Sequence, residues 1–514
     1  MKVYTGQSIK NIEQACFKSG ITEMRLMENA GVACAKVIRK EYDLENQKGK
    51  NVAVLCGKGK NGGDGFVIAR KLYEIGANPT IILTHALPQI AEPVRMLERA
   101  RELEITVLNY DVQSALCRNY IEDADIVVDC IFGIGYHGKA DAKSAAIFDA
   151  VNRSAAAVVS VDVPSGLDSE GIDFDPGHIR ADLTVSISAF KPVHILETTA
   201  PDCGKLVVVG ISIDRRFFRT EKAVAEISDK KIVSAILPPR PEDANKGTFG
   251  HLLMLCGSYR MPGAAVMSAA AAVRSGVGKI TLAFPDKAYA AIASKLNEPL
   301  FLPLASEEKG FFAPEAREEL VKEFENKSAV VVGPGLGREL GSLAVLETAM
   351  KRCKGKLLVD ADGINLLAKN IYLLEERTGE TILTPHLGEF SLLIDKPIED
   401  IKRNRKKYAK QFTERFPHTV LVLKGSNTII ACKGELLHIN PNGNPGLAQG
   451  GTGDVLAGLI GGLAAQGIPA FGAAIAGAYI HGEAGDICAE KFSQRGMSTM
   501  DVVEAIPSSF LQLN

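Results

Sequence analysis

The fold of the amino-terminal half follows from residues 51–65, which read NVAVLCGKGKNGGDG. The run from Asn51 to Cys56 is apolar, as in a buried β-strand, and a glycine-rich segment follows it at once. Glycines at that point let backbone amides approach an anion, and the start of the next helix favours negative charge. The stretch therefore predicts a strand, a ligand-binding loop and a helix, the opening unit of an α/β sheet protein.

The same alternation continues along the first 210 residues. Because apolar strands separated by helices require cover on both faces, the pattern predicts a parallel sheet in a Rossmann-like three-layer domain. The further strands are expected at residues 80–84, 105–108, 125–129, 157–162, 182–188 and 206–209. A helix is expected at residues 66–76.

A charged stretch without a clear strand, residues 214–231, breaks this pattern, and the proline-rich segment 237–241 interrupts any helix. We therefore predict two domains, residues 1–220 and residues 225–514. The second is also α/β, with small-residue helices near its end at 455–466 and 471–489. Its strands are expected at residues 251–256, 279–284, 329–332, 356–360, 381–384 and 419–423.

Composition narrows the function classes. The chain of 514 residues carries 59 basic and 61 acidic side chains, so no nucleic-acid partner of the electrostatic kind is expected. The basic cluster at residues 402–407 is interpreted as a solvated helix face. Ten scattered cysteines suit a reducing cytosol, and neither a signal region nor an apolar span of about 18 residues is present. We expect a cytoplasmic protein without a membrane partner.

Three oxygen-bearing side chains, Asn61, Asp129 and Ser165, lie near the carboxyl ends of predicted strands. Such oxygens suit an alkali or alkaline-earth cation. Asp162 ends another strand, where it could exchange a proton with a bound substrate. The alternative is that these acids only cap helices or turns.

A dinucleotide-binding dehydrogenase is a further alternative. The glycine-rich segment at 57–62 contains GxGxxG, but the next strand ends without an acid for the ribose. A second GxGxxG lies at 133–138, and the strand after it ends at Asp162. The dehydrogenase interpretation therefore stays open through this second segment.

Four motifs in order resemble the NAD(P)H-hydrate epimerase domain over about residues 1–215: LMENAG at 26–31, the 57–65 segment, VDCIFGIG at 128–135 and VDVPSGLD at 161–168. The resemblance implies Asp162 as the catalytic residue and a potassium ion at Asn61, Asp129 and Ser165. Lys60 replaces the first of two asparagines usual in the family. The implied substrate pocket comprises Lys60, Asn61, Gly62, Gly63, Asp64, Gly133, Ile134, Gly135, Tyr136, His137, Gly138, Lys139 and Asp162.

The strongest signal in the second half is NPGLAQGGTGDVLAG at residues 444–458. A glycine cluster opens a small-residue helix there, so free amides can form an anion hole for phosphoryl transfer. Asp454 falls in the first helical turn, where it could take a proton from a substrate hydroxyl. The alternative is an acid that only satisfies the helix dipole.

This segment resembles the ribokinase-type superfamily. The segments KGTFGH at 246–251, MPGAA at 261–265, GPGLG at 333–337, DADGIN at 360–365, TPHLGE at 384–389 and Lys424-Gly425 narrow the resemblance to the ADP-dependent NAD(P)H-hydrate dehydratases, over about residues 225–510. The family's pattern implies a nucleotide site at Lys424, Gly425, Ser426, Asn427, Thr428 and Gly453. It implies a site for the hydrated substrate at Ala265, Gly335, His386 and Asp454. Asp360 and Glu389 fit a Mg²⁺ and water network, while Asn245 and Gln449 depart from the usual residues.

Together the two resemblances imply a bifunctional repair enzyme for hydrated NADH and NADPH. The first domain would interconvert the R and S epimers, and the second would dehydrate the S form at the expense of ADP. Exposed apolar helix faces would allow a homo-oligomer. Two alternatives remain: a vitamin-precursor or sugar kinase in the second domain, and a non-catalytic binding module in the first.

Overall fold

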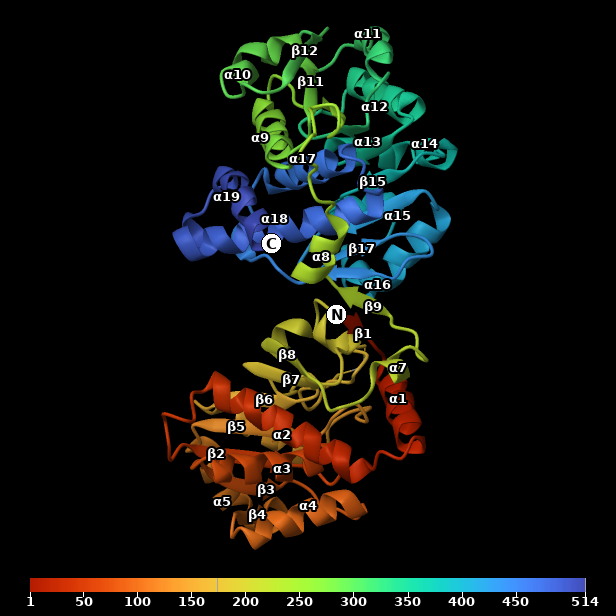
Figure 1. The fold of residues 1–514 in the computed structure, drawn as a ribbon. Coiled ribbons are helices and arrows are strands. Elements are labelled where there is room, and N and C mark those ends of the chain that lie inside the picture. The colour runs from red at the N-terminus through yellow and green to blue at the C-terminus, as the bar shows by residue number, and fades with distance from the viewer. Residues whose placement is uncertain (173, 514) are drawn as a thin grey trace. The chain divides into compact units, whose positions relative to one another are not determined.

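The computed structural model describes residues 1–172 and 174–513 and divides into two compact units, Met1–Ala225 and Glu226–Asn514 (Figure 1). A short strand, β9 (Ala225–Ile227), lies inside the charged stretch where no strand was expected. That prediction was wrong because the strand is only three residues long, too short to produce a periodic pattern. Among the residues described, none of the helices combines the length and the hydropathy needed to span a bilayer.

The first unit contains a parallel sheet in the order β4-β3-β2-β5-β6-β7-β8. Its strands are β2 (Asn51–Cys56), β3 (Asn78–Leu83), β4 (Thr106–Asn109), β5 (Ile126–Cys130), β6 (Ala157–Val161), β7 (Leu183–Ile187) and β8 (Lys205–Val209), preceded in the chain by β1 (Lys2–Val3). Its helices are α1 (Gly6–Lys18), α2 (Glu23–Glu41), α3 (Lys60–Glu74), α4 (Ala91–Glu102), α5 (Tyr110–Glu122), α6 (Ala142–Arg153) and α7 (Arg215–Phe218). The predicted strand series and parallel sheet are confirmed.

Two cores cover this sheet, because alternate strand residues point to opposite faces. Val52, Val54 and Cys56 of β2 pack with α2, α3 and α4, whereas Ala53 and Leu55 pack with α5 and α6. The result is the expected three-layer arrangement.

Helix α3 begins at Lys60, six residues before the predicted start. The glycines that suggested a loop serve close packing instead. A Cβ at Gly62 would lie 1.9 Å from the Gly57 carbonyl oxygen, and one at Gly65 would lie 2.7 Å from Cys56 Sγ. Helix α3 can therefore begin in close contact with the end of β2, and Asn61 lies in its first turn.

The second unit contains a sheet in the order β9-β18-β17-β16-β15-β14-β13-β10-β11-β12, parallel from β16 to β12 and antiparallel at β17. Its remaining strands are β10 (His251–Leu255), β11 (Lys279–Pro285), β12 (Leu300–Leu304), β13 (Ala329–Val332), β14 (Lys356–Val359), β15 (Thr381–Leu383), β16 (Thr419–Leu423), β17 (Thr428–Ala431) and β18 (His438–Asn440). Its helices are α8 (Lys230–Ile236), α9 (Pro262–Arg274), α10 (Tyr289–Ala293), α11 (Ala316–Glu323), α12 (Leu340–Arg352), α13 (Asp362–Lys369), α14 (Tyr372–Glu376), α15 (Leu387–Ile394), α16 (Ile398–Arg415), α17 (Thr452–Ala465), α18 (Ala470–Gly496) and α19 (Thr499–Leu513).

Helix α17 is the centre of this unit. It is buried along almost its whole length and packs with α9, α18 and α19 in one apolar core. A Cβ at Gly458 would lie 1.9 Å from the Ser268 carbonyl oxygen of α9. Small residues are therefore required where these helices cross, and they hold the amino terminus of α17 over the sheet.

Candidate functional sites

A cavity of about 750 Å³ opens at the carboxyl edge of the first sheet. The chain leaves β2 toward β3 and β4 on one side, whereas β5 lies on its other side. Ligands bind in α/β proteins at such a switch point, because the loops on either side diverge and leave a crevice. The walls include one face of α1, the amino-terminal half of α2, the 58–64 and 131–137 segments, and Asp162 at the end of β6.

Most of the expected pocket residues line this cavity. They are Lys60, Asn61, Asp64, Gly133, Ile134, Gly135, Tyr136, His137 and Asp162. Gly62, Gly63, Gly138 and Lys139 lie outside the lining. A Cβ at Gly63 would lie 2.5 Å from Met27 Sδ, so this residue packs against α2. Lys60 forms an ion pair with Glu23, which also lines the cavity.

The three expected cation ligands gather beside the cavity. Ser165 Oγ donates to Asp129 Oδ1 at 2.6 Å, and both residues are fully buried. Asn61 Nδ2 donates to the carbonyl oxygens of Phe132 (2.8 Å) and Val161 (3.3 Å). Asn61 Oδ1 is buried and accepts no hydrogen bond from any residue that the structure describes. An unsatisfied oxygen next to other buried oxygens is what a weakly hydrated cation requires.

Asp162 lies in a network that the sequence did not reveal. Its backbone adopts φ +72°, a left-handed conformation that is rare outside glycine. Its Oδ1 accepts from the Ile187 amide at 3.0 Å and from Lys191 Nζ. Lys191 is fully buried and also donates to the Ile187 carbonyl oxygen at 2.7 Å. The carboxylate is thus held by an ion pair.

His194 completes this network. Its Nδ1 accepts from the Lys191 amide at 3.0 Å, so its Nε2 carries the proton and donates to the Asp162 carbonyl oxygen at 2.9 Å. Burial, and then the nearby Lys191 charge, lowers the pKa of His194 to about 3. The ring is a neutral support for the Asp162 turn. The sequence could have indicated these two residues by their position, because Lys191 and His194 follow β7 at the same edge of the sheet as Asp162.

Glu13 is a further acid in the cavity wall and was also missed. It lies on α1 with Ile9 and Phe17, which line the cavity from the same helix face. Burial raises the pKa of Glu13 to about 7, and the Asp162 charge adds to the shift. The only sequence signal was a single carboxylate among the apolar positions of an amphipathic helix.

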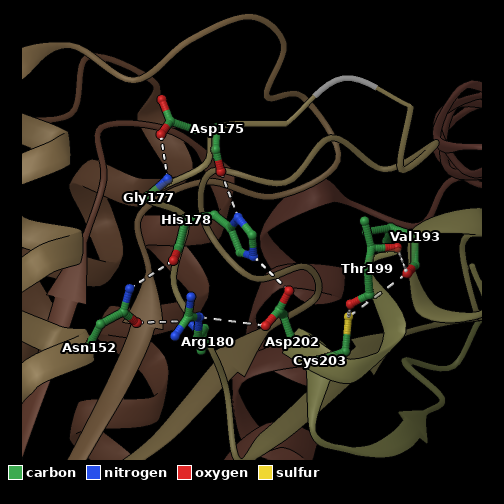
Figure 2. A network of polar contacts seen from close by, with 9 residues as sticks. All are labelled: Asn152, Asp175, Gly177, His178, Arg180, Val193, Thr199, Asp202 and Cys203. Atoms are coloured by element: carbon green, nitrogen blue, oxygen red, sulfur yellow. Dashed lines mark hydrogen bonds and ion pairs between the residues drawn. The ribbon is translucent and has the colours of Figure 1, made fainter. Parts of the chain in front are cut away.

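Figure 2 shows how the segment after Ser165 is anchored. His178 Nε2 lies 3.0 Å from Asp202 Oδ2, and its Nδ1 lies 2.6 Å from the Asp175 carbonyl oxygen. Asn152 Nδ2 donates to the His178 carbonyl oxygen at 2.8 Å, which ties the segment to α6. The Ile179 amide donates to the Ser165 carbonyl oxygen at 2.9 Å, so this network positions Ser165.

In the second unit, the ends of β14 and β16 meet the amino terminus of α17. Lys424 Nζ donates to Asp360 Oδ1 at 3.0 Å, and a Cβ at Gly453 would lie 3.2 Å from that ammonium. Burial works against the Lys424 charge, but Asp360 and Glu389 outweigh it and raise the lysine pKa. Asp454, in the same helical turn, has its pKa raised to about 7 by burial and by Asp360. The Lys424 ammonium group, the backbone amides at the start of α17 and the Asp454 carboxylate therefore lie close together.

The His386 side chain caps a helix and is also exposed to solvent. Its Nδ1 accepts from the Gly388 amide at 3.0 Å and so caps α15, while Glu389 Oε2 accepts from the His386 amide at 2.9 Å. The His386 side chain is 61% exposed. Its Nε2 lies 3.5 Å from Glu389 Oε1, and a contact between His386 and a substrate stays a prediction. Burial raises the pKa of Glu389 to about 7.

The expected nucleotide segment 424–428 is held by Arg405. This buried residue of α16 donates to the carbonyl oxygens of Ser426 (2.8 Å) and Leu423 (3.1 Å). The prediction of a fully solvated basic face at 402–407 was therefore wrong at this position. The reason is tertiary, since those carbonyls come from a strand end brought against α16. Within the segment, Thr428 Oγ1 donates to the Gly425 carbonyl oxygen at 3.0 Å.

Gly335 and Ala265 lie where the segment after β13 meets α9. A Cβ at Gly335 would lie 2.8 Å from Ala264 Cβ, and its φ is +61°. Ala265 is fully buried in the core. Glycine is required at 335 by both space and conformation, while the part of Ala265 in substrate binding stays a prediction.

Comparisons with known proteins match both units. Residues 252–508 match the family model of NAD(P)H-hydrate dehydratase, and residues 23–193 match that of the YjeF-related protein N-terminus. The second unit resembles the ADP/ATP-dependent NAD(P)H-hydrate dehydratase of Bacillus subtilis crystallised with ATP and Mg²⁺ (29% identity, TM-score 0.51, 56% of this chain and 99% of that chain).

Curated relatives extend over nearly the whole chain. The bifunctional NAD(P)H-hydrate repair enzyme Nnr of Moorella thermoacetica is 34% identical over 95% of this chain and 92% of its own length. The enzyme of the same name from Coxiella burnetii is 32% identical over 97% of both chains. The chain therefore belongs to the family of bifunctional NAD(P)H-hydrate repair enzymes.

Proposed function

We propose that this chain repairs hydrated NADH and NADPH. The first unit interconverts the R and S epimers, and the second dehydrates the S form at the expense of ADP, giving NAD(P)H, AMP and phosphate. The observation that carries the proposal is the presence in one chain of a cavity around Asp162 and a helix start with Asp454 beside Lys424. Fusion suits the chemistry, since a phosphoryl-transfer site selects one epimer and the other must be converted.

In the first unit, the substrate carries a hydroxyl group on a ring carbon next to the ring nitrogen. Loss and regain of that hydroxyl inverts the carbon. Asp162 faces the cavity and is oriented by Lys191, so it can take up or give back the proton. Its positive φ directs the carboxylate away from the extended course of β6.

We also propose potassium as the cation of this unit. The ligands would be Asn61 Oδ1, Asp129 and Ser165 Oγ, because Asn61 Oδ1 is buried without a hydrogen bond from the described residues. Amide, hydroxyl and carboxylate oxygens suit a hard cation of low charge. A bound cation would fix the 131–137 segment, which lines the cavity.

In the second unit, Asp454 takes the proton of the substrate hydroxyl, whose oxygen attacks the terminal phosphorus of ADP as AMP leaves. Lys424 and the amides at the start of α17 stabilise the charge on the transferred group. The phosphate then leaves with the C–O electron pair, and loss of a ring proton restores the double bond. Bound Mg²⁺ would neutralise nucleotide phosphates, held by one or two carboxylates such as Asp360 and Glu389.

Two further expectations belong to this proposal: a homo-oligomer and a cytoplasmic setting. All ten cysteines lie in the described part of the chain and are free thiols, which suits a reducing compartment. Hydrated NADH, hydrated NADPH and ADP would be the small-molecule partners.

The decisive test supplies both epimers of hydrated NADH with Mg²⁺, K⁺ and either ADP or ATP, and follows reduced-nicotinamide absorbance. Full recovery, beyond the spontaneous rate of epimerisation, supports both activities. Recovery that stops when the S form is exhausted contradicts the epimerase and favours a binding module. No recovery with either nucleotide contradicts the repair function and redirects attention to a small-molecule kinase.

A further inference from the structure

Among the described residues, five carboxyl groups line the cavity of the first unit, and two of them, Asp162 and Glu13, come from different elements that face the same space. Asp162 comes from the end of β6, and Glu13 comes from α1. Asp162 forms an ion pair with the buried Lys191. No hydrogen bond or ion pair joins Glu13 to the residues that the structure describes, although it is half-buried and lines the cavity.

The charged groups around Glu13 and its burial together determine the protonation state of its carboxyl group. Asp162 and Glu23 oppose its ionisation, whereas Lys60 and Lys191 favour it. Lys60 is already paired with Glu23, and Lys191 with Asp162, so neither is free to pair with Glu13. Burial is the largest effect and raises the pKa of Glu13 to about 7, so both protonation states are populated near neutrality.

Inversion of the hydroxyl-bearing carbon needs an acid as well as a base. One group must protonate the departing hydroxyl, and another must accept a proton from the water that adds. Asp162, which forms an ion pair with the Lys191 ammonium group, suits the role of proton acceptor. Asp64 also lines the cavity, but it is buried, whereas Glu13 is half-buried and more open to a bound substrate.

We propose that Glu13 is a second catalytic residue of the first unit, acting as the general acid while Asp162 acts as the base; this rests on the epimerase activity proposed above. Glu13 donates its proton to the substrate hydroxyl as the C–O bond breaks, and the electron pair leaves with water. The ring nitrogen lone pair forms a C=N⁺ bond. Water adds to the other face, its oxygen forms the new C–O bond, and its proton passes to Asp162. Proton exchange with solvent restores both carboxyl groups.

The test uses the full chain and the purified R epimer of hydrated NADH, with ADP and Mg²⁺ so that the second unit reports each S molecule formed. Glu13→Gln should lower kcat for the R epimer by about 10²–10⁴-fold while KM stays within about threefold. Glu13→Asp should restore part of kcat. The limb of the wild-type pH profile near 7 should be absent in Glu13→Gln. Turnover of the S epimer should be unchanged in each variant.

Glu221→Gln is the matched control. Glu221 accepts from Asn11 of α1 at 3.1 Å and does not line the cavity, so its removal changes the charge beside α1 alone. Wild-type kcat in Glu13→Gln would overturn the role of Glu13 while leaving the epimerase proposal intact. Failure of the wild type itself to convert the R epimer would instead contradict the proposed function.

A label experiment covers the case in which Glu13→Gln does not fold. Wild-type enzyme in H₂¹⁸O without nucleotide should place one ¹⁸O in the hydroxyl group for each inversion. Inversion with the original oxygen retained would overturn the two-carboxyl route.

Discussion

Lys191 and Asp162 form an ion pair at the carboxyl edge of the first sheet, and the lysine has no exposed surface. Lys191 Nζ has three acceptors, one of which is Ser186 Oγ at 3.1 Å. Such complete pairing is what makes a buried charge tolerable. The pair therefore orients the proposed catalytic carboxylate and is also part of the core.

Replacing Lys191 by Met should cost about 3–5 kcal/mol of unfolding free energy, because it leaves a buried carboxylate without its partner. Denaturant unfolding of the first unit measures this loss. Lys205→Met is the control: Lys205 pairs with Glu41 at 2.7 Å on the surface, and its loss should cost about 0–1 kcal/mol. Equal losses in the two variants would contradict a special role for the buried pair.

Potassium should stabilise the first unit through Asn61. In the wild type, the unfolding midpoint should be higher in KCl than in LiCl at equal ionic strength, since a ligand bound to the folded state alone raises stability. Asn61→Ala should remove most of that difference. Asn29→Ala should keep it, because Asn29 donates to the Ile211 carbonyl oxygen and is none of the three expected cation ligands. Equal wild-type midpoints in both salts would count against the cation site.

Asp454→Asn should abolish dehydration yet stabilise the second unit at pH 8. The folded-state pKa is raised to about 7, so between about pH 4 and pH 7 the folded chain keeps a proton that the unfolded chain has released. Wild-type stability therefore falls as pH rises through that window, and the variant should exceed it by roughly 1–3 kcal/mol at pH 8. Denaturant unfolding at pH 4 and pH 8 measures the effect.

Asp501→Asn is the control of opposite sign. Hydrogen bonds from Ser498 lower the pKa of Asp501, so this variant should not be more stable than the wild type at pH 8.

Since a general base must be ionised, wild-type kcat/KM for dehydration should rise with pH through about 7. A flat profile would argue against Asp454 as the base.

Arg405→Met should raise KM for ADP about tenfold or more, because the 423–426 segment loses its buried hydrogen bonds. Lys407→Met should leave KM near the wild-type value, since Lys407 belongs to the same basic cluster but is exposed. Steady-state kinetics with varied ADP compares the two. The same KM in both variants would show that the anchoring by Arg405 is dispensable.

The glycine-rich segment after β2 was predictable from the sequence only in part. Its position was predictable, because apolar runs and glycine clusters are local signals, while its role in ligand binding stays a prediction. Its conformation was not, since α3 begins at Lys60. The glycines answer a packing requirement against Gly57 and Cys56, which depends on how helix and strand approach each other.

The sequence by itself determined two α/β units, the strands of the first sheet, the strands β10, β11 and β13–β16 of the second, and the candidate acids Asp162 and Asp454, because these rest on local periodicity and on short motifs. Only the tertiary structure decided which charges are buried and paired. Lys191 lies 29 positions from Asp162, and Lys424 lies 64 positions from Asp360. Each pair meets because parallel strands end at one edge of a sheet, and burial there sets the ionisation of Glu13 and Asp454.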